Sequence, residues 1–389
     1  MSRQRIARSI GIGRIAGTPI SVDGGLAILA GLFIITLAIE GFPQLAPDST
    51  LGLRLAVATA TVAGFLVSIL GHELGHAVVA NRQGVGVLGI TLSLLGGYAQ
   101  LERQAPTPRA EFSIAAAGPA VNLVIGGVLG AGTFVAHRLE LLGDLALGAL
   151  VWLAGVNIVL AVLNLFPAAP LDGGRVLTAA LWKRLRDAET ARIISGRVGL
   201  ILGMALGFVG AVQLFRGGWQ GVVTLVVALF LFNGARGEIG TAAIRRRLHA
   251  TTAQQLMISD PPSVSDSLTI EQLVSFAGSE RAGVAFPVIR WSADPIGYVI
   301  PTAGAALSEL DRSSRRVSEV MSPTPEVARA WMTESIDDVL GRLERLDDFL
   351  VVVHEPRAGR VVGTLSEGQV GPLFAAPDLW GRDRSPTPA

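Results

Sequence analysis

Six long stretches without charged residues dominate the first 240 residues of the chain. They cover residues 24–39, 55–71, 112–136, 145–171, 198–215 and 217–235. A helix of roughly 20 apolar residues crosses the hydrocarbon of a bilayer, which is about 30 Å thick. With their flanking turns, the stretches predict six transmembrane helices in a polytopic α-helical membrane domain over residues 1–247. The first stretch has no small-residue cleavage site, so we expect it to remain in the mature chain as an anchor.

Between the second and third stretches, residues 85–101 are apolar but rich in glycine, which makes them a poor spanning helix. Non-helical backbone at membrane depth is tolerated only where it is buried in protein or lines a cavity. The segment therefore predicts a re-entrant β-hairpin, and a plain interfacial loop is the alternative. A hairpin would offer a strand edge with which an unwound substrate segment could pair.

After Arg247 the pattern becomes mixed and charged, as in a soluble domain. An internal repeat of roughly 64 residues pairs 253–257 with 317–321, 268–270 with 334–336, and 286–288 with 349–351. We therefore expect a second domain over residues 248–375, built from two tandem α/β units at about 250–311 and 315–372. The polar residues 376–389, rich in Pro, Arg and Asp, predict a disordered tail.

Composition narrows the function classes. Half of the residues are hydrophobic and only 16% are charged, which excludes a single soluble globular domain. The net charge of +1 predicts no nucleic-acid partner. Because the chain has no Cys, disulfides, thiol nucleophiles and Cys-ligated metals are excluded, and any metal must be bound by His and carboxylates.

The distribution of basic residues predicts the orientation in the membrane. If the N-terminus is cytoplasmic, the outer turns contain only Arg138 and Arg216. The cytoplasmic turns then contain Arg82, Arg103, Arg109, Arg175, Lys183, Arg184, Arg186, Arg192, Arg197, Arg236 and the run Arg245 to Arg247. We therefore expect a multi-pass plasma-membrane protein with its N-terminus and its second domain in the cytoplasm.

The candidate chemistry begins near the end of the second span, at His72-Glu73-Leu74-Gly75-His76. Two His one helical turn apart lie on the same face of a helix, and this spacing suits a tetrahedral metal ion. Ionisable residues inside an apolar span are costly unless they have partners, so three within five residues indicate a functional site. The alternative is a pair of structural His in the core.

A zinc site needs a third protein ligand, and several acidic residues lie near the membrane. The candidates are Asp23, Glu40, Glu102, Glu111, Glu140, Asp144 and Asp172. Topology places Glu40, Glu140 and Asp144 on the wrong side. Asp172 closes the fourth span, which returns to the side of the His pair, after two prolines that break the helix. Taken alone, Asp172-Gly173-Gly174 is typical of a turn or helix cap.

These residues together predict a catalytic zinc site with one ion per chain. His72, His76 and Asp172 would leave the fourth zinc position open for water, whose pKa falls to about 7 on the metal. Glu73 would take the proton from that water as general base and then pass it to the leaving amine as acid.

Four landmarks carry a family resemblance. They are residues 72–76, the pair Gly96-Gly97, Ala117-Gly118-Pro119-Ala120-Val121-Asn122-Leu123, and the run from Asn164 to Arg175 with its Leu-Asp-Gly-Gly. On these landmarks the chain resembles the site-2 protease family of intramembrane zinc metalloproteases, the peptidase M50 type, in the group that carries a cytoplasmic pair of CBS modules.

The resemblance implies the roles of five residues. His72, His76 and Asp172 become zinc ligands, Glu73 the catalytic acid/base, and Asn164 a donor to the substrate carbonyl. The resemblance also implies that the substrates are single-span membrane proteins, cleaved within or near their transmembrane segments.

Asparagine side chains in the spans have two interpretations. An amide that points into a dry site stabilises a developing oxyanion, which supports the role of Asn164. Hydrogen bonding between helices is the alternative, and for Asn122 and Asn157 we favour it. Asp23 stands where His is common in the family, and the sequence assigns it no role.

The repeat in the second domain resembles tandem CBS domains, best at 317–323 and 363–366. Such pairs often dimerise and bind adenine nucleotides. The family's ribose-contacting pattern is a Gly, two apolar residues, Thr or Ser, two variable residues and Asp. Here Ala303 and Gln369 stand at the two Asp positions, and Ile300 replaces the hydroxyl residue in the first unit. We therefore expect a homodimer through the CBS domains with weak or no nucleotide binding.

Two other protein classes fit the sequence less well. A CBS-regulated channel or transporter would need polar residues along several spans, but spans three to six have almost no ionisable side chains between their ends. A catalytically inactive scaffold would lack a ligand or the base, and none of these positions is missing.

Overall fold

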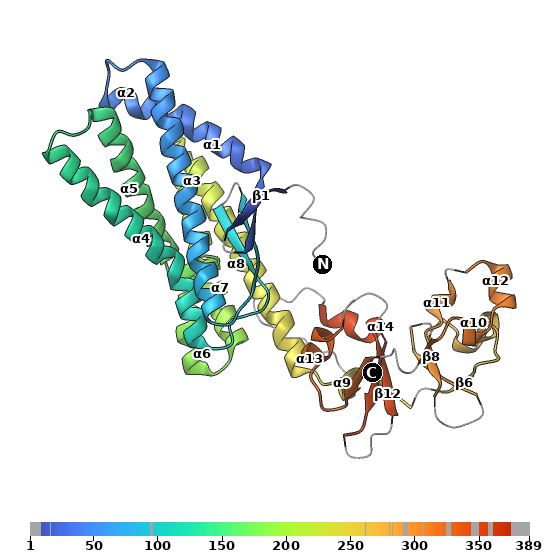
Figure 1. Cartoon of the computed structure of the whole chain (residues 1–389). Helices are drawn as coiled ribbons and strands as arrows, with labels where there is room; N and C mark the ends of the chain where they lie inside the picture. Colours follow the sequence, from blue (N-terminus) through green and yellow to red (C-terminus); the bar gives the residue numbers. More distant parts are fainter. Residues whose placement is uncertain are drawn as a thin grey trace. The chain divides into compact units, whose positions relative to one another are not determined.

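The chain divides into two compact units, Met1–Ile239 and Gly240–Ala389, and each is described by itself. The computed structural model (Figure 1) describes residues 9–15, 17–93, 96–260, 262–279, 281, 283–290, 295–305, 307–323, 328–343, 350–356 and 361–374. The predicted tail, 376–389, lies outside the described residues. The boundary precedes the predicted one at residue 247, because Ile244 and Leu248 pack in a hydrophobic core of the second unit.

The six predicted spans are confirmed as six helices long and apolar enough to cross a membrane. The first runs over Gly24–Leu45 and consists of α1 (Gly24–Thr36), the π-helical turn η2 (Leu37–Gly41) and α2 (Phe42–Leu45). The others are α3 (Leu51–Arg82), α4 (Pro108–Arg138), α5 (Asp144–Asn164), α7 (Ala188–Phe215) and α8 (Gln220–Ala250).

Polar residues start several of these helices. Thr50 and Thr107 accept hydrogen bonds from the backbone N–H groups of Leu53 and Ala110 at the starts of α3 and α4. Asp23, which had no role in the sequence analysis, caps α1 by accepting a 2.8 Å hydrogen bond from the N–H of Gly25. An Asp directly before an apolar run is itself a helix-start signal.

The fourth predicted span, 145–171, is too long at its C-terminal end. Helix α5 ends at Asn164, and residues 165–171 form turns before a short helix, α6 (Asp172–Leu185), that was not predicted. Pro167 and Pro170 have no backbone N–H and cannot continue the helix. As a result Asn164 ends one helix and Asp172 starts the next.

The glycine-rich segment forms the predicted β-hairpin, with β3 (Val87–Ser93) antiparallel to β4 (Gly96–Leu101). It belongs to a four-stranded sheet in the order β1-β2-β3-β4, in which β1 (Ser9–Ile15) and β2 (Thr18–Asp23) were not predicted. Strand β3 pairs with β2 on one side, in parallel, and with β4 on the other. Because β4 is the last strand in the order, it lies at an edge of the sheet. The position of the hairpin in the membrane stays a prediction.

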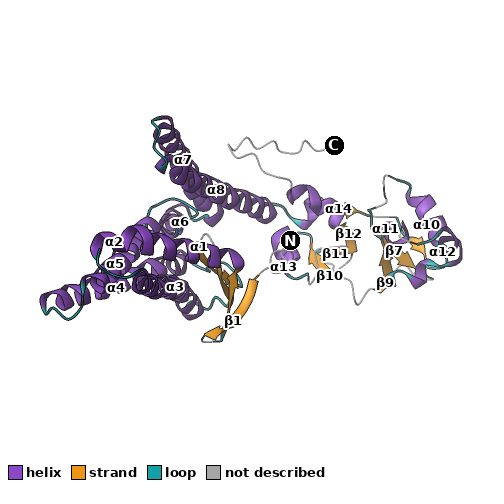
Figure 2. Cartoon of the chain, turned by 90° about the horizontal axis from the view of Figure 1, so that it is seen from above, coloured by secondary structure: helices purple, strands orange, loops and turns teal. Residues whose placement is uncertain are grey.

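Helices α3, α4 and α5 pack side by side, as Figures 1 and 2 both show. Gly75 lets α3 approach α4 closely, since a Cβ there would lie 2.9 Å from Val121 Cγ2 and 3.1 Å from the Ala117 carbonyl oxygen. This contact lies beside the two His of α3, so the close helix packing places those His against α4.

The second unit contains two four-stranded sheets. The first has the order β6 (Val264–Ser265), β7 (Phe286–Ile289), β8 (Gly297–Val299), β9 (Ser322–Pro323), and the second β10 (Ala328–Trp331), β11 (Leu350–His354), β12 (Val361–Ser366), β5 (Ile258–Ser259). The helical segments are α9 (Ala253–Leu256), α10 (Ile270–Ala277), α11 (Thr302–Ala305), α12 (Glu309–Ser314), η3 (Val317–Glu319), α13 (Ile336–Gly341), α14 (Glu367–Val370) and η5 (Gly371–Phe374).

The two sheets have the same topology, but they exchange one strand. Strand β5 follows α9 yet pairs with β12 in the second sheet, while β9 pairs with β8 in the first. Each half of the predicted repeat therefore completes the other. One detail of the repeat was wrong: Phe286 pairs with Val299 as Val351 pairs with Leu365, so Phe286 corresponds to Val351. Phe349, its predicted counterpart, lies outside the described residues.

Candidate metal centre

The two His of the motif lie one turn apart on the buried face of α3. Their Nε2 atoms are 3.1 Å apart, and both side chains are almost fully buried. The Nδ1–H of His76 donates a 2.6 Å hydrogen bond to the Ile114 carbonyl oxygen of α4. Because this bond occupies Nδ1, it orients the ring and leaves Nε2 as the atom that can bind a metal.

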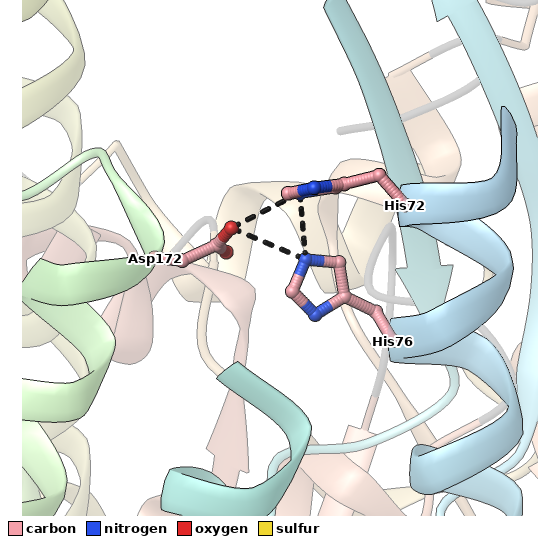
Figure 3. A group of neighbouring side chains, drawn as sticks. All are labelled: His72, His76 and Asp172. Carbon is pink, nitrogen blue, oxygen red and sulfur yellow. Dashed lines mark hydrogen bonds and ion pairs between the residues drawn. The ribbon is translucent and has the colours of Figure 1, made fainter. Parts of the chain in front are cut away.

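Asp172 faces the His pair from the first turn of α6 (Figure 3). Its Oδ2 lies 3.1 Å from His72 Nε2 and 3.2 Å from His76 Nε2. Burial raises the pKa of the Asp172 carboxyl, but the two imidazole groups lower that pKa well below its ordinary value, so the carboxylate stays ionised. The structure thus brings together residues 100 positions apart in the chain.

The three side chains fit a zinc ion. Among the residues that the structure describes, His72, His76 and Asp172 form a group whose ligand atoms all lie within 4.8 Å of one another. Two imidazoles and one carboxylate are a zinc donor set that leaves a coordination position open. Gly118 of α4 lies against both rings, and a Cβ there would be 2.5 Å from His72 Nε2 and would collide with His76 Nε2.

Close packing also holds the segment that carries Asp172. Added Cβ atoms at Gly173 and Gly174 would collide with the backbone of residues 165–169, so only glycine allows this tight turn. Ser195 of α7 donates a 2.7 Å hydrogen bond to the Gly174 carbonyl oxygen. Pro170 packs on Gly234 of α8, where a Cβ would be 2.5 Å from Pro170 Cγ.

Glu73 lies between the His pair and the edge strand β4. Its side chain is buried, and its carboxylate lies near the backbone of Ala99 in β4. It also packs on Gly97, where a Cβ would be 2.5 Å from Glu73 Cγ. The absence of a side chain at Gly97 therefore makes room for the glutamate beside the strand.

One cavity of about 680 Å³ connects the predicted site residues. His72, Glu73, His76, Asp172 and Asn164 all line it. Asn164, the last residue of α5, is one of these residues, so the structure places all five predicted site residues around one space.

Asn122 also lines this cavity, although the sequence favours hydrogen bonding between helices as its role. Its buried Oδ1 has no hydrogen-bond partner among the described residues, and neither has Nδ1 of His72. The sequence contains a signal for this position. Asn122 belongs to the same landmark as Gly118 and lies one helical turn after it, on the same face of the helix. The interpretation of Asn157 was wrong, because its amide donates a 2.8 Å hydrogen bond to Leu153 within the same helix.

Comparison with known proteins agrees with this site. The family model of peptidase family M50 matches residues 60–148 and 143–206. The chain is 32% identical over 348 residues to the putative zinc metalloprotease Rip3 of Mycobacterium tuberculosis, which covers 87% of this chain and 86% of that protein. It is 29% identical over 378 residues to the putative zinc metalloprotease sll0528 of Synechocystis, which covers 94% of this chain and 96% of that protein.

Two solved structures are also similar. One is the site-2 protease from Methanocaldococcus jannaschii, at 27% identity and a TM-score of 0.40, with 59% of this chain and 95% of that chain covered. The other is the CBS domain of a bacterial CNNM/CorC family Mg2+ transporter, at 19% identity and a TM-score of 0.29, with 39% of this chain and 93% of that chain covered.

The six long apolar helices of the described residues, together with the His-His-Asp group, define a multi-pass membrane protein of the zinc metalloprotease class. The chain belongs to peptidase family M50 and is a metalloendopeptidase of the site-2 protease type.

Proposed function

We propose that the chain hydrolyses peptide bonds within or near the transmembrane segments of membrane proteins, with one zinc ion per chain held by His72, His76 and Asp172. The observation that carries the proposal is the single cavity in which these ligands meet Glu73 and Asn164, inside a bundle of apolar helices. A site shielded by such helices is suited to substrates that are themselves in the membrane.

The side chains of the cavity have separate tasks in the reaction. When bound, zinc lowers the pKa of water to about 7 and polarises the scissile carbonyl. Glu73 accepts the proton of the attacking water and delivers it to the leaving amine nitrogen. The Asn164 amide donates a hydrogen bond to the carbonyl oxygen, where negative charge develops. The bond from His76 to Ile114 holds that imidazole in one orientation throughout.

Strand β4 is the proposed docking edge for the substrate backbone. A transmembrane helix hides its peptide bonds in its own hydrogen bonds, so the segment to be cut must be unwound. Residues Gly96 to Ala99 of β4 line the catalytic cavity, and β4 ends the sheet order. An extended segment paired with this edge would lie beside Glu73.

The proposed substrates are single-span membrane proteins, and cells can reveal them. We expect quantitative comparison of membrane proteins in cells with the wild-type enzyme and the Glu73→Gln variant to show uncut single-span proteins accumulating in the variant. Their cytoplasmic fragments should be present only with the wild-type enzyme. Identical membrane proteomes under conditions that express the enzyme would contradict this substrate class.

The proposed orientation places the N-terminus and the second unit in the cytoplasm of a plasma-membrane protein. The Cys-free chain allows a direct test with an impermeant thiol reagent. Single variants Gln44→Cys and Leu141→Cys should react from outside, whereas Arg186→Cys and Gln255→Cys should react only from the cytoplasm. Reaction of Arg186→Cys from outside would place His72 and Asp172 at opposite faces of the membrane and contradict the proposed metal site. All four positions are exposed in the structure, so absence of labelling from one side reports topology.

The second unit is proposed to act through dimerisation, with weak or no adenine-nucleotide binding. In the second repeat, the hydroxyl of Ser366 is buried and lies 2.7 Å from the Gly283 carbonyl oxygen and 2.7 Å from Gln369 Oε1. The Thr364 hydroxyl likewise donates to the Ala285 carbonyl oxygen at 3.1 Å. Both hydroxyls are thus used between the two repeats, which supports a structural role for them.

Calorimetry can test this part of the proposal. Each unpaired polar group costs about 1–3 kcal/mol, which weakens binding by roughly ten- to a hundred-fold. A fragment of residues 240–375, which keeps the packing of Ile244 and Leu248, should run as a dimer and show little heat with ATP, ADP or AMP at millimolar concentration. The Gln369→Asp variant, which restores the family's carboxylate, is the matched comparison. Micromolar binding by the wild-type fragment would make the unit a nucleotide sensor instead.

A further inference from the structure

An ion pair with a buried carboxylate and a partly exposed guanidinium lies beside the metal centre and has no role in the reaction described above. Arg175 of α6 donates a 2.9 Å hydrogen bond from Nε to Oε1 of Glu111 in the first turn of α4. The Glu111 side chain is only 5% exposed, while that of Arg175 is 35% exposed and lines the catalytic cavity. An unpaired buried carboxylate is strongly unfavourable, so the pairing of Glu111 differs from a solvated surface contact.

Both partners are one helical turn from a residue that defines the metal centre. On α4, Glu111 precedes Ile114, whose carbonyl oxygen accepts the hydrogen bond from His76. On α6, Asp172 precedes Arg175 by the same three residues. Residues three apart lie on the same face of a helix. The start of α4 therefore contacts both halves of the site, the His pair through Ile114 and the Asp172 helix through Glu111.

We propose that Glu111 and Arg175 are positioning residues that set the place of the Asp172 carboxylate relative to the two imidazoles. The ligands come from two separate helices, α3 and α6, and α4 contacts both. Without the ion pair, α6 would keep its glycine packing but lose its polar link to the helix that orients His76. This inference rests on the proposed ligand set of His72, His76 and Asp172.

The test measures zinc affinity of the full-length protein in detergent by competition with chelators of graded affinity. Loss of a group hydrogen-bonded to a metal ligand typically lowers metal affinity about 10- to 100-fold. Because Glu111 acts one contact further out, through Arg175, we expect a loss of about 10-fold, at the lower end of that range, for Glu111→Gln. The absorption spectrum of the cobalt-substituted protein should change as well, because the Asp172 ligand shifts. The matched control is Glu189→Gln, which removes the similarly buried pair of Glu189 with Arg192 on α7. It should keep wild-type zinc affinity and the wild-type cobalt spectrum.

A double-mutant cycle separates positioning from general stability. If Glu111 acts through Asp172, Glu111→Gln should lower zinc affinity no further in the Asp172→Asn background. Should Glu111→Gln alone fail to fold, the double variant Glu111→Gln with Arg175→Gln removes both charges and should show the same affinity loss in a folded protein.

Two results would overturn the inference, namely equal losses for Glu111→Gln and Glu189→Gln, or an additive loss in the Asp172→Asn background. Wild-type zinc affinity in Asp172→Asn would instead reject the proposed ligand set itself.

Discussion

The Glu73→Gln variant is expected to keep about one zinc per chain and to lose peptide-bond cleavage. Glu73 lines the cavity beside the His pair but is not part of the metal-binding group. General acid–base catalysis contributes roughly 10²- to 10⁴-fold in rate, so cleavage should fall by at least about a hundred-fold. Zinc content of the purified protein and cleavage of a membrane substrate in detergent provide the two measurements.

The ligand variants give the contrast that makes this result meaningful. His72→Ala, His76→Ala and Asp172→Ala should lower zinc occupancy as well as activity, because each removes one donor of the group. If Asp172→Ala kept wild-type zinc affinity and activity, another carboxylate would have to be the third ligand. If Glu73→Gln lost its zinc, the glutamate would have to be reassigned from acid/base to metal binding.

The Gly118→Ala variant is expected to lose most of its zinc affinity although it adds only one methyl group. The new Cβ would lie 2.5 Å from His72 Nε2 and 2.7 Å from His72 Cε1, and it would also collide with His76 Nε2. The rings can escape only by moving their ligand atoms. Overpacking typically costs about 1–3 kcal/mol, which corresponds to roughly ten- to a hundred-fold in zinc affinity.

Gly127→Ala on the same helix is the control for this substitution. A Cβ at Gly127 has no other atom within 4 Å, so the variant should bind zinc as the wild type does. Chelator competition on both proteins measures the difference. Equal zinc affinity in Gly118→Ala and Gly127→Ala would mean that the space beside the imidazoles is not needed for the metal.

The six spans were predictable because the bilayer imposes a local rule. Each span must satisfy its backbone hydrogen bonds internally and present about 20 apolar residues, so its signal lies within a single stretch of sequence. The His pair was predictable for the same reason, since residues four apart in one helix share a face. Pro167 and Pro170 likewise indicated the helix break before Asp172, although the predicted span 145–171 included both prolines.

Elements whose partners are distant in the chain were harder to predict. Strand β2 gains its place by pairing with β3, which lies more than 60 residues later, and β1 joins the sheet by pairing with β2. The exchange of β5 and β9 between the two repeats also leaves no mark on local patterning, because each strand has only two residues. Strand formation depends on its neighbours more than on intrinsic backbone preference.

The site divides in the same way. The sequence by itself determined the residue types, their spacing in α3, and the position of Asp172 directly after the break that follows the fourth apolar stretch. Only the tertiary structure decided that Glu111 pairs with Arg175 instead of binding metal, that Asn122 lines the cavity, and that Gly118 lies against both imidazoles. Hydrogen bonds and close contacts between helices depend on register and rotation, and these are settled when side chains pack at full density, a condition that no single stretch of sequence contains.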